Sequence, residues 1–457
     1  MMIHSLHRTR EIFDVGFDAG SVWRSSAAKR GAFLHRRLVA VGGRGVAVRR
    51  LGGCRAGEIR LTRFLRNPAV TFQEMALTAA ARTGARCRGA RHVLAIQDTT
   101  VVRSEGGGGH YLHAMICVEA GDGALLGLAD GQFLSRGGGK KGKRRSLPIE
   151  HKESMRWLDG AQAAVDVCAG AERVTVIADR EGDIYEAFAR CPAGTELLIR
   201  AAHDRALADG GRLFACIDAL PEAGRTQILL PARPGKGPET AIFSVRFSKA
   251  ALKKPANGAR SPRDPDAVGV YAADLRQINA AAGADPVHWR LLATQPVTNL
   301  AQALEVAGLY RRRWLIEQVF RTLKTKGFDI EALRIEDEAP REKLVMATLI
   351  AAVSVQQLVH ARDGLGDSAA PRPLTDVFDA ADRSLIEAFS ASLEGKTARQ
   401  KNPHPKHSLA YATWVCARLG GWTGYYGKPG PITILRGYLD LKAASRGANI
   451  MKGLHDV

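Results

Sequence analysis

Two short apolar runs, each followed closely by an aspartate, constrain the fold of this chain more than any other feature. Val93 to Ile96 leads into Gln97 and Asp98, and Val174 to Ala178 leads directly into Asp179. Such runs are typical of buried strands, and in α/β folds the ends of these strands open onto a crevice. We therefore predict an α/β fold that brings both carboxylates to one crevice. For any single aspartate, a role in a turn or a helix cap is the alternative.

A long helix predicted over Leu300 to Lys326 supplies a third carboxylate. Tyr310, Arg313, Glu317 and Lys324 project at about 0°, 300°, 340° and 320° on a helical wheel, which is one narrow face. The opposite face carries apolar residues, namely Leu315, Ile316, Val319 and Leu323. A carboxylate between two cations and a phenol suits a metal ligand surrounded by groups that bind phosphate. An ordinary salt-bridged amphipathic helix is the alternative.

The net charge of +20 indicates a polyanionic partner. Nucleic acid is the leading candidate and an anionic membrane surface the second. No stretch approaches 18 uninterrupted apolar residues, and the most apolar one, Leu344 to Val359, contains four polar residues. We expect that stretch to be a core helix, the chain not to bind a membrane, and Met1 to Phe13 not to be a secretory signal.

The seven cysteines are scattered, and none forms a C-x-x-C pair. This pattern argues against a disulfide framework and against a zinc site. The simplest interpretation is a reduced cytoplasmic protein whose cysteines act as small hydrophobic residues.

The spacing Tyr310-x2-Arg313-x3-Glu317-x6-Lys324 resembles the Y-R-E-K signature of bacterial DDE transposases of the insertion-sequence-four family. Other segments resemble that family in the same order. Ile96 to Thr100 is similar to the segment around its first catalytic aspartate, and Ala178 to Ile184 to the segment around its second. Phe64 to Pro68 and Ala417 to Trp422 are similar to stretches of its terminal domains. The resemblance runs from about Ala56 to Arg436.

The resemblance implies a ribonuclease-H-like catalytic core with a β-rich insertion, flanked by N-terminal and C-terminal helical regions. Asp98, Asp179 and Glu317 would bind two Mg²⁺ ions, with Mn²⁺ as a substitute. The expected reaction is cut-and-paste transposition of an insertion sequence. A nick frees a 3′-hydroxyl, a hairpin forms and opens, and the end joins target DNA. The partners would be double-stranded transposon ends and target DNA, bound by a homodimer in the bacterial cytoplasm and nucleoid.

The resemblance also suggests which groups contact DNA, beyond Tyr310, Arg313 and Lys324. Hairpin formation requires a flipped base, which needs an aromatic platform. Trp289, 21 residues before Tyr310, has close to the family's spacing for that tryptophan, although a core aromatic is its alternative role. Trp314 projects near Tyr310 on the wheel and is a second candidate. Arg200 resembles a family arginine near the flipped base.

We expect the core to comprise residues 91–205 and 290–365, with the insertion at 206–289 and a C-terminal helical domain at 366–457. Residues 56–90 would be the remnant of an N-terminal helical DNA-binding domain. Residues 1–55 diverge from the family: positions 21–55 hold nine Lys or Arg and no acid. They are a basic arm or a poorly structured segment, and we hypothesise that they are a frameshift relic. For the glycine-rich loop Arg136 to Arg145 two roles are open: contact with the DNA backbone, or a solvated loop without a partner.

Two rival functions remain at this stage. A structure-specific nuclease would share the three carboxylates but would not need Trp289 or the Tyr310 face. A non-catalytic DNA-binding protein descended from a transposase would not need the carboxylates at all.

Overall fold

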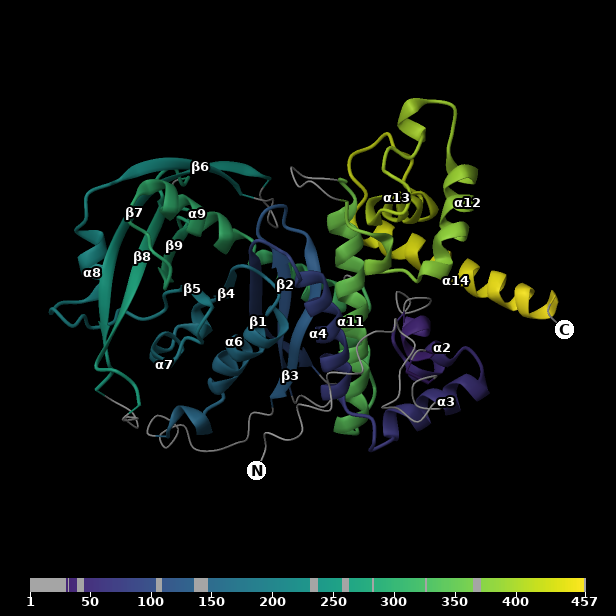
Figure 1. The fold of residues 1–457 in the computed structure, drawn as a ribbon, viewed down its shortest axis with the longest axis horizontal. Helices are drawn as coiled ribbons and strands as arrows, with labels where there is room; N and C mark the ends of the chain where they lie inside the picture. The colour runs from purple at the N-terminus through teal and green to yellow at the C-terminus, as the bar shows by residue number, and fades with distance from the viewer. Residues whose placement is uncertain are drawn as a thin grey trace.

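The computed structural model describes residues 30–31, 33–38, 45–103, 109–134, 147–230, 237–256, 263–281, 283–324, 327–364 and 371–455. Its centre is one nine-stranded mixed sheet in the order β3-β2-β1-β4-β5-β9-β8-β7-β6 (Figure 1). The strands are β1 (Val93–Arg103), β2 (Gly109–Glu119), β3 (Leu125–Leu134), β4 (Val174–Ala178), β5 (Glu196–Arg200), β6 (Gly224–Leu230), β7 (Glu239–Lys253), β8 (Ala267–Gln277) and β9 (His288–Ala293). The predicted α/β class is confirmed.

Strands β1, β4 and β5 are parallel to one another, and the remaining pairs are antiparallel. The strand-rich stretch expected after Glu196 is observed. Its strands extend the same sheet, because β9 pairs with β5 on one side and with β8 on the other. The insertion is therefore continuous with the core through backbone hydrogen bonds. The domain boundaries given above stay predictions.

Strand β1 is longer than the apolar run that predicts it. It continues to Arg103, so Asp98 lies inside the strand, opposite Ala114 of β2. The parallel pairing with β4 ends at Ile96 and Ile177. Asp98 and Asp179 each lie two residues beyond this last pair, so they are at the same level of the sheet.

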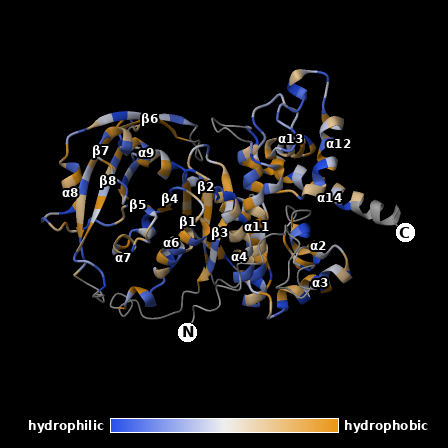
Figure 2. Ribbon diagram, viewed as in Figure 1, coloured by the Kyte–Doolittle hydropathy of each residue, from blue (hydrophilic) through white to orange (hydrophobic). Residues whose placement is uncertain are grey.

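The two faces of the sheet bury separate cores, as period-two alternation requires. Leu94, Ile96 and Ile177 belong to the core on one face, together with residues of α9 (Leu300–Arg311), α10 (Trp314–Leu323) and α11 (Glu338–Ala361). Their sequence neighbours belong to the core on the other face, with residues of α6 (Met155–Val167), α7 (Tyr185–Ala189) and α8 (Leu213–Asp218). Hydrophobic residues gather along these strands and helices (Figure 2). By the same alternation, Asp98 and Asp179 point to the α10 side.

The remaining helices surround one end of the sheet (Figure 1). They are α2 (Val48–Gly52), α3 (Arg55–Arg66), α4 (Phe72–Cys87), α12 (Arg383–Leu393), α13 (Leu409–Leu419) and α14 (Pro431–His455). Short 3₁₀ turns are η3 (Ile149–His151), η4 (Arg180–Gly182), η5 (Ile330–Ala332), η6 (Leu374–Asp376), η7 (Ala380–Asp382) and η8 (Ala398–Gln400). The sequence pattern of Thr71 with Glu74 three residues later predicts a capping box, and this is confirmed at the start of α4, where the two residues exchange hydrogen bonds.

The prediction of one helix from Leu300 to Lys326 is wrong. Helix α9 ends at Arg311 and α10 begins at Trp314. At the junction, the N–H groups of Arg312 and Arg313 donate to the carbonyls three residues earlier, which tightens the chain into a 3₁₀ turn. The turn separates Tyr310 on α9 from Glu317 on α10.

Helix α11 confirms the core helix expected around Leu344 to Val359. It is long and apolar enough to cross a membrane, but 78% of its most apolar window is buried inside the protein. It packs against β3, α3, α4, α10, α13 and α14. It therefore serves as a core helix that joins the sheet to both groups of terminal helices.

Part of the basic N-terminal segment is ordered. Residues 33–38 are helical, and Leu34, Leu38 and Leu51 are fully buried in the core that contains α11. The poorly structured alternative is therefore wrong for these residues. The loop Arg136 to Arg145 lies outside the described residues.

Candidate active site

Three carboxylates from separate elements approach one another on the α10 side of the sheet. Asp98 comes from the middle of β1, Asp179 follows β4, and Glu317 lies in the first turn of α10. Asp179 also caps η4, where its Oδ1 accepts the Glu181 N–H at 2.9 Å. The charges of both Asp179 and Glu317 act on Asp98, so all three groups occupy one site.

Arg313 links two of these carboxylates. Its guanidinium donates to Asp98 Oδ2 at 2.9 Å and to Glu317 Oε1. The side chain is only 16% exposed. Although burial disfavours its charge, the neighbouring Tyr310, Asp98 and Glu317 raise the pKa of Arg313 above its ordinary value. Arg313 is thus a permanent cation between two acids.

One arginine does not balance the negative charge of the site. Burial raises the pKa of Asp98 to about 7, the charge of Asp179 adds to this, and Arg313 and the Thr99 N–H only partly oppose it. A carboxyl group with such a pKa is deeply buried and lies close to another negative charge. A cation bound beside Asp98 would favour its ionised form.

The donor set fits divalent cations such as Mg²⁺, which prefer carboxylate oxygens. Asp98, Asp179 and Glu317 are the groups that would hold them. Within the described residues, however, the oxygens of these three side chains do not all lie within 4.8 Å of one another. Arg313 lies between Asp98 and Glu317, so joint ligation requires its guanidinium to move aside.

The predicted DNA-contacting residues Tyr310, Arg200 and Trp289 lie together beside the carboxylates. Tyr310 is buried, and the charged groups of Arg313 and Arg200 lie close to its hydroxyl. The Trp289 ring packs edge-on to Tyr310 at 6.2 Å and stacks on Phe243 at 5.5 Å. Burial raises the pKa of Tyr310, so its hydroxyl keeps its proton at neutral pH.

Arg200 and Trp289 are also tied to the sheet. Arg200, the last residue of β5, donates to the His288 carbonyl at 2.7 Å. Trp289 lies in β9 opposite Leu275 and is half-buried. The core-aromatic role and the platform role of Trp289 are therefore compatible, because one edge packs inward while part of the ring stays accessible.

Lys324 and Trp314 lie further from the carboxylates. Lys324 follows the last residue of α10, two helical turns or about 10 Å beyond Glu317, and pairs with Glu331 at 3.8 Å. Burial lowers its pKa. Trp314 begins α10 and is 47% exposed, whereas Tyr310 is 5% exposed. The helical wheel that placed Trp314 near Tyr310 assumed one continuous helix. Because α9 and α10 are separate helices, that wheel does not apply to the two residues.

A buried polar chain that the sequence did not reveal supports Asp98 from the opposite face of the sheet. The Gln97 amide donates to the Trp157 carbonyl, and its oxygen accepts from His113 Nε2. His113 Nδ1 accepts from the Thr99 hydroxyl, which in turn accepts from Arg156. Burial lowers the pKa of His113 to about 3, so the ring is neutral and can both donate and accept. Gln97 and Thr99, the two neighbours of Asp98 in β1, are held in place by these hydrogen bonds.

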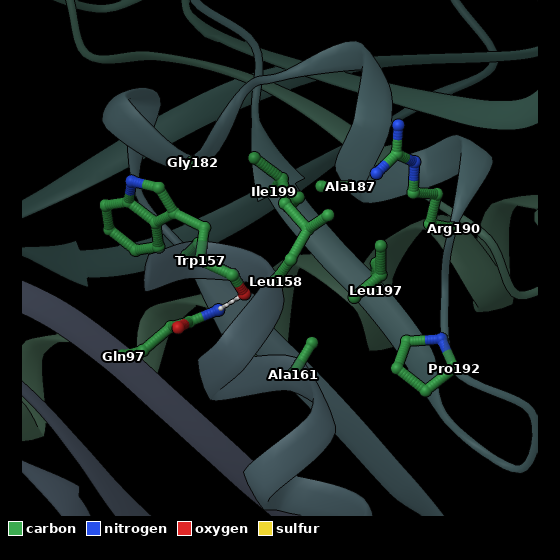
Figure 3. Close-up of a pocket in the computed structure, with 11 residues that line it drawn as sticks. Gln97, Trp157, Leu158, Ala161, Gly182, Ala187, Arg190, Pro192, Leu197 and Ile199 are labelled. Atoms are coloured by element: carbon green, nitrogen blue, oxygen red, sulfur yellow. Dashed lines mark hydrogen bonds between the residues drawn. The ribbon is translucent and has the colours of Figure 1, made fainter. Parts of the chain in front are cut away.

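A small enclosed cavity lies beside these hydrogen-bonded side chains, between α6 and the strands (Figure 3). Gln97 and Ala178, the residues before Asp98 and Asp179, help to line it, together with Trp157, Gly182 and Ile199. The indole N–H of Trp157 has no hydrogen-bond partner among the described residues. The cavity is closed by side chains on the face away from the carboxylates, so it supports the site and is no substrate pocket.

Comparison with known protein families agrees with this geometry. The model of the family described as transposase DDE domain matches residues 125–354, just over half of the chain. The match contains Asp179 and Glu317 and begins after Asp98. The family implies a ribonuclease-H-like core, catalyses DNA cleavage and strand transfer, and uses divalent metal ions. The chain belongs to the transposase DDE domain family.

Proposed function

We propose that the chain is a cut-and-paste transposase of the insertion-sequence-four type, in which Asp98, Asp179 and Glu317 form the catalytic triad. The observation that carries this proposal is the convergence of the three carboxylates from β1, the end of β4 and α10 on one face of the sheet. Phosphodiester cleavage needs that convergence, because charge develops on the phosphate during an in-line displacement.

Two Mg²⁺ ions, or Mn²⁺ in their place, would activate the attacking oxygen and stabilise the leaving one when bound to these carboxylates. The protein residues prepare this step. Asp98 has to release its proton to become a ligand, and its pKa near 7 makes that release easy at neutral pH. Arg313 holds Asp98 and Glu317 until cations arrive, and its guanidinium then becomes available to a phosphate oxygen.

The substrates are the double-stranded ends of the element and a target DNA. Trp289 and Tyr310 provide an aromatic surface for a flipped base, and Arg200 lies beside it to contact the backbone. Lys324 and the exposed Trp314 lie on the same helix as Glu317 and extend this surface along α10. The chain acts as a homodimer on paired ends, in the bacterial cytoplasm and nucleoid.

A Glu317→Gln variant tests the proposal. The change removes one ligand charge but keeps the shape of a side chain that is 32% exposed. We expect Mg²⁺-dependent nicking of the element's ends to fall at least about a thousandfold, which corresponds to about 4 kcal/mol of transition-state stabilisation. DNA binding should be retained, and Glu387→Gln, on α12 with a side chain that is 34% exposed, is the matched control.

The same assay separates the rival functions. Joined products with a target DNA support the transposase, whereas cleavage without joining indicates a structure-specific nuclease. Full activity of Glu317→Gln would refute the catalytic triad. Tight, sequence-specific binding of the ends by the intact chain would refute the idea that residues 1–55 are a frameshift relic.

A further inference from the structure

Three buried cysteines meet on the face of the sheet opposite the carboxylates. Cys87 is the last residue of α4, Cys117 lies in β2, and Cys168 follows the last residue of α6. Their sulfur atoms all lie within 4.8 Å of one another, and each residue is at most 1% exposed. This trithiol cluster joins segments that are 30 to 81 residues apart in the chain.

The spacing of the sulfurs matches metal coordination. Sγ of Cys117 lies 3.4 Å from Sγ of Cys168, and Sγ of Cys168 lies 4.0 Å from Sγ of Cys87. With metal–sulfur bonds of about 2.3 Å, ligand sulfurs are about 3.8 Å apart in a tetrahedral site and about 4.0 Å apart in a trigonal one. A disulfide would need about 2.05 Å. The cluster thus has the dimensions of a three-sulfur cage.

We propose that the trithiol cluster binds one thiophilic d¹⁰ cation, Zn²⁺ or Cu⁺, through its three sulfurs. Each bound thiol releases its proton to solvent as the metal–sulfur bond forms. Among the residues that the structure describes, no His, Asp or Glu joins this group, so the coordination is by sulfur alone. Soft thiolate ligands select this class of ion over Mg²⁺, which keeps the site independent of the catalytic carboxylates.

The bound ion ties three elements behind the active site. It links the ends of α4 and α6 to β2, and α6 also carries Arg156 and Trp157 of the polar chain that supports Asp98. Because the three ligands come together only in the folded chain, binding free energy becomes folding free energy. We therefore expect the ion to enter during folding and to raise the midpoint of thermal unfolding.

Metal analysis of the purified full-length chain tests this proposal. After dialysis against EDTA, we expect about one Zn²⁺ or Cu⁺ per chain, and refolding without oxygen in the presence of either ion separates the two. Refolding with Cd²⁺ should give the ultraviolet charge-transfer absorption of cadmium bound to sulfur. That signal excludes the catalytic carboxylates and the group of His110, Glu338 and Glu342, whose donors are nitrogen and oxygen.

Cys117→Ser should abolish the absorption and the retained metal, whereas Cys191→Ser, a half-buried thiol beside Thr195, should change neither. The wild-type metal content decides the matter even if Cys117→Ser does not fold. Refolded wild-type chain that retains no stoichiometric metal and shows no cadmium–sulfur absorption would overturn the proposal and leave three packed thiols.

Discussion

Asp98 and Asp183 are two acids at the same end of the sheet with opposite environments. The two oxygens of Asp183 accept from the N–H groups of Ala202 and His203 and twice from Arg205, and its side chain is fully buried. Asp98 accepts from one N–H group and from an arginine that it shares with Glu317. Asp183 therefore stabilises the fold, whereas Asp98 is left short of positive charge.

The comparison also shows that two aspartates only four positions apart in the chain can have different roles. Asp179 and Asp183 both lie in the segment that follows β4, yet only Asp179 faces the other carboxylates. Asp183 holds the turn after β5 through Arg205. A buried acid whose acceptor sites are all used stabilises the fold, whereas a buried acid with free acceptor sites has oxygens available for a ligand.

Removing Asp183 should have the largest effect on stability. Asp183→Ala removes the carboxylate that pairs with the buried Arg205 and leaves two N–H groups without their acceptor, and we expect a loss of about 3–5 kcal/mol in the free energy of unfolding. Urea denaturation measures this loss. The control is Glu222→Ala, which breaks the exposed pair with Arg225 and should cost at most about 1 kcal/mol. Equal losses in the two variants would contradict the comparison.

Asp98→Asn should raise the free energy of unfolding in metal-free buffer, whereas Asp183→Ala should lower it. Because the folded-state pKa of about 7 lies above the ordinary 3.8, the folded chain binds the proton more tightly, and stability falls as pH rises between those values. The variant avoids this cost. Near pH 8 it should be more stable than the wild type by up to about 4 kcal/mol.

This stabilisation should shrink as the pH falls from 7 towards 4, because the folded wild type is already protonated at Asp98 and the unfolded chain approaches the pH at which its own Asp98 binds a proton. Thermal unfolding of both proteins across that range, in EDTA, provides the measurement. A variant that is less stable than the wild type at pH 8 would show that Asp98 is a structural acid like Asp183.

Arg313→Gln should expose the role of the shared arginine. Without its charge, Asp98 and Glu317 repel each other, and the loss of two charged hydrogen bonds should cost about 1–3 kcal/mol. Mg²⁺ should then raise the unfolding temperature more in the variant than in the wild type. Identical Mg²⁺ shifts in calorimetry would mean that cations bind elsewhere.

Trp289 tests whether the extended part of the sheet takes part in the reaction. Trp289→Ala should slow hairpin formation by about 10- to 100-fold, as expected for a lost stacking contact of about 1–3 kcal/mol, while the first nick proceeds normally. Trp289→Phe, which keeps a ring on Phe243, should recover most of the rate. A uniform loss at both steps would assign Trp289 to the core alone. Gel analysis of the cleavage intermediates separates these outcomes.

Local patterns in the sequence predicted much of the fold. The apolar runs before Asp98 and Asp179 are strands, the Thr71 capping box begins α4, and the apolar stretch around Leu344 is a core helix. Each signal depends on near neighbours in the chain. The convergence of Asp98, Asp179 and Glu317 required the resemblance as well, since no local pattern measures the distance between them.

Features that depend on distant partners could not be predicted. The turn at Arg312 and Arg313 contains neither Gly nor Pro, and it accompanies side-chain contacts to Gly121 and Asp98 about 190 to 215 residues away. The chain from Gln97 through His113 to Arg156 spans three elements. The trithiol cluster escaped the search for C-x-x-C pairs because its members lie on three separate elements.

The central position of α11 has a consequence for synthesis and turnover of the protein. Earlier elements cover part of its 24 residues, and the rest is covered when α13 and α14, which follow it in the chain, have packed against it. A nascent or proteolysed chain that ends near residue 364 would expose an apolar helix long enough to enter a bilayer. Such fragments should aggregate or be captured by chaperones, so nonsense mutations in the last fifth of the gene should remove the protein from the cell.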